Sequence, residues 1–242
     1  MRIDVLLIWL ERMRRSFLVS GWLICNNMFV WIRMDGYLNI FVVFMAGTVF
    51  ALTQINNRNI NEIVVKEEHH DPLPDLFHTI LPHWLREWHE YSDYVPIVPL
   101  VFFLLIDQGS HFFIFLYVIT LVYLLRSIAF GLTILPCPTP HCECEWEVDP
   151  KTTLRGILNL LYQEGCNDLI FSGHTSMMVT SSLFLIYYHF RGSLWVKIMF
   201  LCYNLVGIFT IVGTRLHYSV DVFLGSLVST VVFFLHHPGF LM

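Results

Sequence analysis

The chain has 242 residues, of which 56% are hydrophobic and only 14% are charged. A soluble domain usually carries about a quarter charged residues, so this composition excludes an ordinary soluble globular protein. With a net charge of −5, the chain lacks the basic surface that binds a phosphate backbone, and we expect no nucleic-acid partner.

The N-terminal segment, residues 1–36, is rich in arginine. Loops rich in Lys and Arg stay in the cytosol, so we predict that this segment is cytosolic. No small-residue cleavage site follows its apolar start, and we expect no cleaved signal peptide. Residues 16–32 are apolar but interrupted by glycine and asparagine. We favour an interfacial amphipathic helix there, with a seventh span as the open alternative.

Six apolar stretches from residue 37 onward are predicted to cross the membrane, whose hydrocarbon layer is about 30 Å thick. The second stretch is the shortest and contains Pro96 and Pro99. The predicted spans cover residues 37–55, 94–106, 111–134, 169–190, 194–214 and 217–236. We therefore predict an all-α, polytopic integral membrane protein in which residues 37–242 form one six-span domain.

Two long loops, residues 58–93 and 135–168, lie opposite the cytosolic side in this topology. Four cysteines fall in or near the second loop, on the lumenal or extracellular side, where disulfides can persist. Four cysteines allow three pairings, and the sequence does not choose among them. A zinc site using His141 matches no common spacing, so we favour disulfides or free thiols. The cysteines are Cys137, Cys142, Cys144 and Cys166.

Two short polar motifs, residues 168–175 and 215–221, carry most of the chemical information. One span inward and the next outward return both motifs to the same face of the membrane. His217 and Asp221 are four residues apart, so on a helix they would share one face. The carboxylate could then hold the imidazole tautomer and leave the other nitrogen free to attack. His174, predicted about 7 Å inside its helix, would meet an interfacial phosphodiester.

Residues beside these motifs are candidates for binding phosphate. Gly173 leaves space for a phosphate, and N–H groups at a helix start can donate to its oxygens. Arg126 either contacts phosphate or extends outward to the membrane surface with no catalytic part. The other ten histidines have no partner at an informative spacing, and we expect packing roles for them. The candidate substrate contacts are Asp168, Ser172, Gly173, Thr175, Arg126 and Arg215.

At these residues the chain resembles the sphingomyelin synthase family, within the lipid phosphatase and phosphotransferase superfamily. Four segments resemble family motifs in order and extend over most of the chain. They are residues 72–75 (Pro-Leu-Pro-Asp), 126–138, 166–175 and 217–221 (His-Tyr-Ser-Val-Asp). The family usually has Gly where this chain has Asn167.

This resemblance implies that residues 37–242 form a lipid phosphotransferase domain. His217, oriented by Asp221, would attack the phosphorus of phosphatidylcholine or phosphatidylethanolamine and become a phosphohistidine. His174 would protonate the leaving diacylglycerol and then activate the hydroxyl of ceramide. The resemblance implies no metal and no cofactor, and a Golgi or plasma-membrane enzyme with a lumenal or extracellular site.

Two other functions are alternatives to this interpretation. A lipid phosphate phosphatase would share Ser172-Gly173-His174, but its upstream Lys-to-Arg-Pro motif is missing from this chain. A non-catalytic lipid-binding protein would not need two histidines and a buried acid. The sequence leaves open the transferred head group (phosphocholine, phosphoethanolamine or phosphoinositol), the compartment and whether the chain forms homo-oligomers.

Overall fold

The computed structural model describes residues 38–54, 56, 72–82, 89–133, 135–136, 138 and 170–237. All regular elements within these residues are helices, which confirms the all-α prediction for this part of the chain. Cys137, Cys142, Cys144, Cys166 and residues 1–36 lie outside the described residues. The elements are helix Leu38–Gln54, α2 (Leu76–Ile80), α3 (His89–Ser92), α4 (Tyr94–Asp107), α5 (Phe112–Leu132), α7 (Gly173–Phe184), η2 (Leu185–His189), α8 (Leu194–Gly213) and α9 (Ser219–His236).

Three of the six predicted spans coincide with described helices that are long and apolar enough to cross a membrane. These are α5, α8 and α9. The helix Leu38–Gln54 and α4 are apolar but shorter, and α7 continues into the five-residue π-helix η2. Membrane crossing by these other three stays a prediction.

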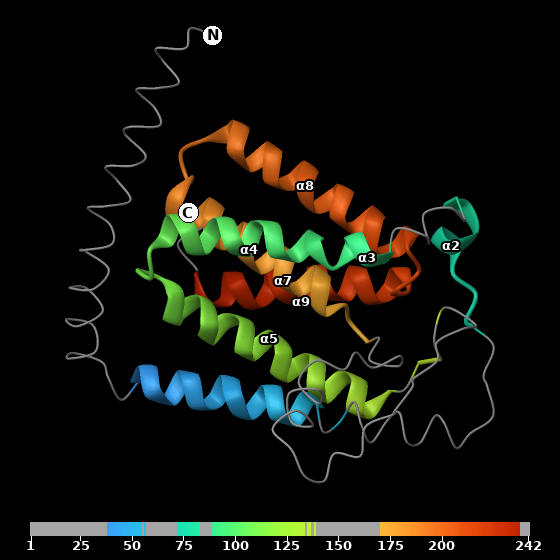
Figure 1. Ribbon diagram of the computed structural model, residues 1–242, viewed down its shortest axis with the longest axis horizontal. Coiled ribbons are helices and arrows are strands. Elements are labelled where there is room, and N and C mark those ends of the chain that lie inside the picture. Colours follow the sequence, from blue (N-terminus) through green and yellow to red (C-terminus); the bar gives the residue numbers. More distant parts are fainter. Residues whose placement is uncertain are drawn as a thin grey trace, which may run out of the picture.

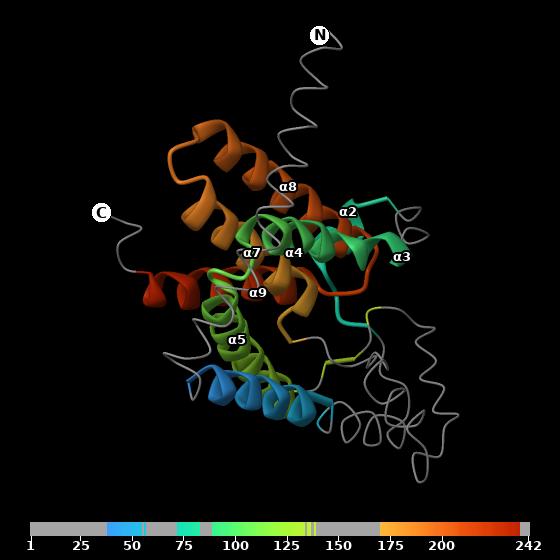
Figure 2. The same ribbon diagram turned by 60° about the vertical axis from the view of Figure 1, so that its left-hand side comes forward.

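Helix α7 lies at the centre of the bundle and packs against α4, α5, α8 and α9 (Figures 1 and 2). Aromatic rings fill the core next to it: Phe184 is fully buried, with ring centroids 5.6 Å from Phe103 and 5.4 Å from Phe233. Edge-to-face pairs of this kind add to the stabilisation from burial alone. Because α7 is central, its first turn lies close to the starts of α4 and α9.

Small side chains allow α7 and α9 to approach closely. Ser176 Oγ donates to the carbonyl of Ser172 at 2.9 Å and lies 3.5 Å from the carbonyl of Gly225. A Cβ atom at Gly225 would come within 2.8 Å of the Ser172 carbonyl oxygen. Helices in membranes pack on small residues in this way, because the backbones can then make close contact. The two polar motifs at the starts of α7 and α9 are therefore drawn together.

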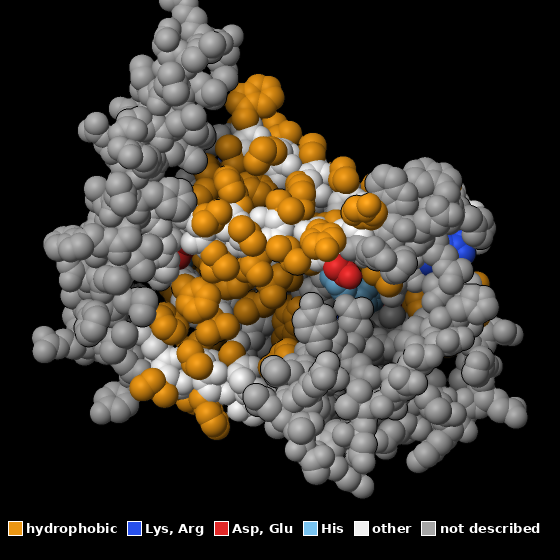
Figure 3. Space-filling model, in the orientation of Figure 1, with side chains coloured by type: hydrophobic (Ala, Val, Ile, Leu, Met, Phe, Trp, Pro, Cys, Tyr) orange, Lys and Arg blue, Asp and Glu red, His pale blue; other side chains and the backbone are white. Residues whose placement is uncertain are grey.

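The described surface outside this core is strongly apolar. Hydrophobic side chains cover the face shown in Figure 3, and acidic and histidine side chains gather near the start of α3 and α4. Leu132 and Trp195 are more than 80% exposed, which fits lipid-facing positions on α5 and α8. This polar patch beside the apolar face marks the region of the site.

Candidate active site

The first turn of α7 presents His174 at the rim of the bundle. Ser172 is the N-cap, and its hydroxyl accepts a hydrogen bond from the Thr175 N–H at 3.3 Å. Serine is a favoured N-cap because it satisfies a helix N–H group that has no partner within the helix. The described helix thus begins at Gly173, four residues after the predicted start of this span at residue 169. His174 is the second residue of α7, and the predicted depth of about 7 Å within the helix is wrong.

His217 lies in a bend two residues before α9, which begins at Ser219. The prediction that His217 and Asp221 share a helix face is wrong, because His217 is outside the helix. Asp221 is instead the third residue of α9 and completes a capping box: its Oδ2 accepts the Tyr218 N–H at 3.1 Å. Asp221 is fully buried and His217 is 5% exposed. An orienting contact between the Asp221 carboxylate and the His217 imidazole stays a prediction.

The two histidines lie side by side despite their separation in sequence. Their ring centroids are 6.0 Å apart, and the rings are inclined at 63°. The Ser172 N–H donates to the carbonyl of Asp221 at 3.0 Å, which joins the start of α7 directly to the start of α9. Rings this close allow one nitrogen of each histidine to contact the same phosphate group placed beside the pair.

Asp93 belongs to the same cluster, and the sequence interpretation missed it. It precedes the first residue of α4, and its Oδ1 lies 3.2 Å from Nε2 of His174. The Asp93 side chain is 46% exposed and that of His174 is 27% exposed, so the pair faces outward. A carboxylate at this distance can hold the orientation of the imidazole ring. The sequence signal that could have identified Asp93 is its position at the end of the acidic loop, just before the second predicted span.

The short helix α2 is held against the start of α9 by Asp75. Its Oδ1 accepts the Ser219 hydroxyl at 2.6 Å, and its Oδ2 accepts the Ser219 N–H at 2.7 Å. Burial opposes the charge of Asp75, but the hydrogen bonds from Ser219 and from the His78 N–H outweigh it and lower the pKa of the carboxyl group. Residues 72–75, singled out as the first motif, thus form part of the support around His217.

His78 and Arg215 complete this support. His78 stacks on Tyr218 at 5.8 Å between ring centroids, and its Nε2 lies 3.1 Å from the carbonyl oxygen of His217. Arg215 donates to the carbonyl of His78 at 2.7 Å. Burial lowers the pKa of His78, and the nearby Arg215 charge acts in the same direction. The expectation of a mere packing role for His78 missed these contacts, which form only in the folded chain.

Arg126 packs against the start of α7. It is 6% exposed, so its side chain does not extend outward to the surface, and its Nε donates to the carbonyl of Phe171 at 2.9 Å. A Cβ atom at Gly173 would lie 3.3 Å from the guanidinium and from the hydroxyl of Tyr123. Glycine at this position therefore makes room for these two side chains beside His174.

The remaining predicted substrate contacts are Ser172, Thr175 and Asp168. The Ser172 and Thr175 side chains are fully buried beneath the first turn of α7. Asp168 lies outside the described residues. Among the described residues, the site thus gathers His174, His217 and Asp221 with Asp93, Arg126 and the α2 support.

Comparison with known proteins places this arrangement in a family context. Residues 165–238 match the family model described as PAP2 superfamily C-terminal, which includes both histidine motifs. The chain is 30% identical over 216 residues to human phosphatidylcholine:ceramide cholinephosphotransferase 1, covering 81% of this chain and 52% of that protein. It is 27% identical over 208 residues to rat phosphatidylcholine:ceramide cholinephosphotransferase 2, covering 74% and 53%.

A third relative carries a related name. The mouse sphingomyelin synthase-related protein 1 is 26% identical over 209 residues, covering 78% of this chain and 42% of that protein. The chain thus spans about half the length of the curated relatives that it matches. These similarities confirm the resemblance predicted from the four motifs.

Proposed function

Because this chain is a homologue of the sphingomyelin synthases and matches the PAP2 superfamily C-terminal model, we propose that it transfers a phospho-head group from a glycerophospholipid to ceramide. The products are a sphingophospholipid and diacylglycerol. Phosphocholine from phosphatidylcholine is the head group we favour, since two of the relatives are named for that reaction. The observation that carries the proposal is the pair of histidine rings 6.0 Å apart at the rim of an apolar helix bundle.

In the first half of the reaction, a ring nitrogen of His217 attacks the phosphorus of the donor lipid. The bond between phosphorus and the glycerol oxygen breaks, and protonated His174 gives its proton to that oxygen. Diacylglycerol leaves and the head group stays on His217 as a phosphohistidine. The contact between His174 and Asp93 supports this role, because a carboxylate beside one ring nitrogen orients the other nitrogen toward the leaving oxygen.

In the second half, neutral His174 accepts the proton of the ceramide hydroxyl. The hydroxyl oxygen attacks phosphorus, the bond from phosphorus to His217 breaks, and both histidines return to their starting states. Asp221 holds the tautomer of His217 through its buried carboxylate. Arg126 and the N–H groups at the start of α7 offset the negative charge that grows on the phosphate oxygens.

We also propose the six-span topology, with residues 1–36 cytosolic and the two histidines at the lumenal or extracellular end. Golgi and plasma membrane are the two locations that we propose for this orientation. Ceramide and the donor can then enter sideways from the bilayer, since the described face around the polar patch is apolar (Figure 3).

The direct test is a transfer assay on membranes that contain the chain. Fluorescent ceramide is supplied with phosphatidylcholine, phosphatidylethanolamine or phosphatidylinositol, and the labelled product is identified. We expect a labelled sphingophospholipid that is lost in H217A and kept in H236Q, an exposed histidine far from the site. Free phosphate released from phosphatidic acid would instead indicate a phosphatase, and no turnover by folded protein would refute an enzyme.

A further inference from the structure

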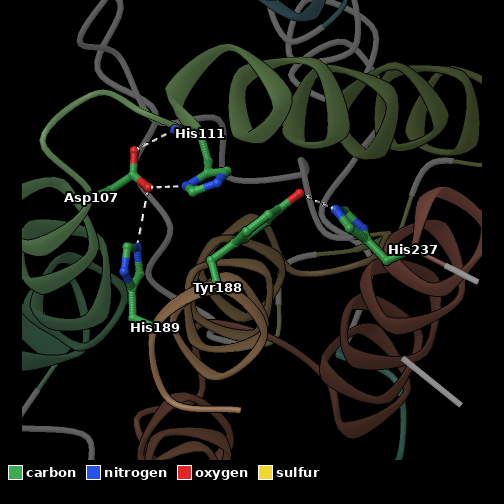
Figure 4. Close-up of polar contacts among 5 residues, drawn as sticks. All are labelled: Asp107, His111, Tyr188, His189 and His237. Carbon is green, nitrogen blue, oxygen red and sulfur yellow. Dashed lines mark hydrogen bonds and ion pairs between the residues drawn. The ribbon is translucent and has the colours of Figure 1, made fainter. Parts of the chain in front are cut away.

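A second cluster of metal-ligating side chains lies at the other end of α4. It consists of Asp107, His111 and His189, drawn in Figure 4. Asp107 is the last residue of α4, whose 14 residues extend about 21 Å at 1.5 Å per residue. Asp93, which contacts His174, precedes the first residue of that helix. The second cluster is thus separate from the proposed active site.

One carboxylate oxygen faces both imidazole rings. Asp107 Oδ1 lies 2.6 Å from Nδ1 of His111 and 3.1 Å from Nε2 of His189. The other oxygen, Oδ2, accepts the backbone N–H of His111 at 2.7 Å, which holds the carboxylate in this orientation. The three ligand atoms all lie within 4.8 Å of one another. One ion can therefore contact all three after only a small movement of the rings.

The backbone around the cluster is irregular in a way that aims these side chains. The turn after Asp107 contains Gln108 at φ 52° and Gly109 at φ 86°, and it brings His111 back over the end of α4. His189 is the last residue of the π-helix η2. Single π-helical turns are rare, and they occur often at functional sites. Three separate elements thus converge on the cluster.

A neighbouring aromatic ring holds the His111 ring in place. The His111 ring stacks on Tyr188 with 3.8 Å between centroids, and the Tyr188 hydroxyl lies 2.9 Å from Nε2 of His237 (Figure 4). The Asp107 side chain is 1% exposed, whereas those of His111 and His189 are 30% and 17% exposed. The cluster thus has a buried charge on its inner side and an open side toward solvent.

We propose that Asp107, His111 and His189 bind one Zn²⁺ ion through Oδ1, Nδ1 and Nε2. Two imidazoles and one carboxylate form a common three-ligand zinc set, and the fourth position is taken by water on the open side. Imidazole ligands favour zinc over magnesium or calcium, which prefer oxygen ligands. The ion would neutralise the buried carboxylate and clamp the ends of α4, α5 and η2 together.

The test is zinc binding by the full chain, purified in detergent, stripped with a chelator and titrated with Zn²⁺. Bound zinc per protein is measured by elemental mass spectrometry, and Co²⁺ is used as a spectroscopic probe of tetrahedral coordination. Other histidines and cysteines of the chain can take up zinc, so the readout is the difference between variants. H236Q is the matched control, since His236 is an exposed histidine at the end of α9.

We expect D107N, H111Q and H189Q each to lose one zinc equivalent, or to bind it at least about 100-fold more weakly, while H236Q binds as the unaltered chain does. H111Q and H189Q decide the question if D107N does not fold, because each removes one partly exposed ring. Equal zinc stoichiometry and affinity in folded H189Q and H111Q would overturn the proposal and leave a hydrogen-bonded network alone.

Discussion

The two ends of α4 make the same kind of contact, one with α7 and the other with its continuation η2, but in different surroundings. At one end Asp93 lies 3.2 Å from His174, and at the other Asp107 lies 3.1 Å from His189. The Asp93 side chain is 46% exposed, whereas that of Asp107 is 1% exposed. A half-exposed pair can exchange protons with a substrate, while a fully buried carboxylate must keep its partners. An aspartate–histidine pair thus takes part in the proposed reaction at one end of α4, and another such pair holds helix ends together at the other.

The side chains around the two aspartate–histidine pairs also differ. The Asp93 end includes a second histidine ring, His217, and the buried guanidinium of Arg126 beside Gly173. The Asp107 end has a third ligand-type side chain, His111, and the aromatic ring of Tyr188. A catalytic site for phosphate transfer needs cationic and N–H groups, and the first end supplies both through Arg126 and the start of α7.

The largest expected effect is at His174. We predict that H174Q lowers ceramide transfer by about 10²- to 10⁴-fold, the range of general acid–base catalysis. Glutamine keeps the size and polarity of the side chain but cannot exchange a proton at neutral pH. The measurement is turnover with labelled ceramide, with H236Q as the control histidine. A fall of less than tenfold would remove His174 as the proton carrier.

The second largest effect is expected at Asp93 and distinguishes it from Asp107. We predict that D93N lowers kcat by about 10- to 100-fold with little change in KM, because it removes a charged hydrogen-bond partner of His174. D93E should restore part of the activity and shift the pH profile less than D93N does. If D93N altered KM alone, Asp93 would bind substrate and not position the imidazole.

The corresponding change at the buried end should act mainly on stability. We predict that D107N lowers the free energy of unfolding by about 2 kcal/mol or more, since it removes a charge that both rings contact. D93N should lower the melting temperature less, because that side chain is half exposed. Thermal unfolding of both variants in one detergent checks this order, and the reverse order would break the comparison.

A smaller effect is expected at Gly173. In G173A the added Cβ atom would press on the Arg126 guanidinium and the Tyr123 hydroxyl at 3.3 Å. We predict a loss of about 1 kcal/mol in stability and a moderate fall in turnover as Arg126 shifts. G192A is the matched control, because a Cβ atom at Gly192 meets nothing within 4 Å. Equal behaviour of the two variants would show that Gly173 makes no special room.

The smallest effect is a pH dependence of α2 docking. Burial lowers the pKa of His78 below its usual 6.5, so the undocked form takes up the proton first. Docking is therefore fully stable above pH 6.5 and weakens as the pH falls through the lowered pKa. We predict that hydrogen-exchange protection of α2, corrected for intrinsic rates, falls below pH 6.5. H78Q should lack this dependence, and an unchanged profile in H78Q would assign it to another group.

Much of this arrangement could be predicted from the sequence, because it depends on local patterns. Apolar stretches indicated the helices, and the pairing of spans indicated that His174 and His217 face the same side. The exact helix starts could not be predicted as well. Ser172 and Tyr218 are the N-caps of α7 and α9, which places His174 in the first turn of its helix and His217 just outside its helix.

The missed residues depend on contacts between distant segments. Asp93 meets His174 across 81 positions of sequence, and His78 meets His217 across 139. No spacing rule links such residues before the helices are packed. The cluster of Asp107, His111 and His189 was missed for the same reason, although Asp107 and His111 are only four apart.

The central claim is that His174 and His217 act on one phosphorus atom, and the most direct measurement is to trap the intermediate. The chain is mixed with phosphatidylcholine that carries labelled phosphorus, without ceramide, and quenched. We predict label on the protein that is labile to acid and stable to base, that is absent in H217A, and that ceramide removes far more slowly in H174Q than in the unaltered chain. Equal labelling of H217A would contradict the account.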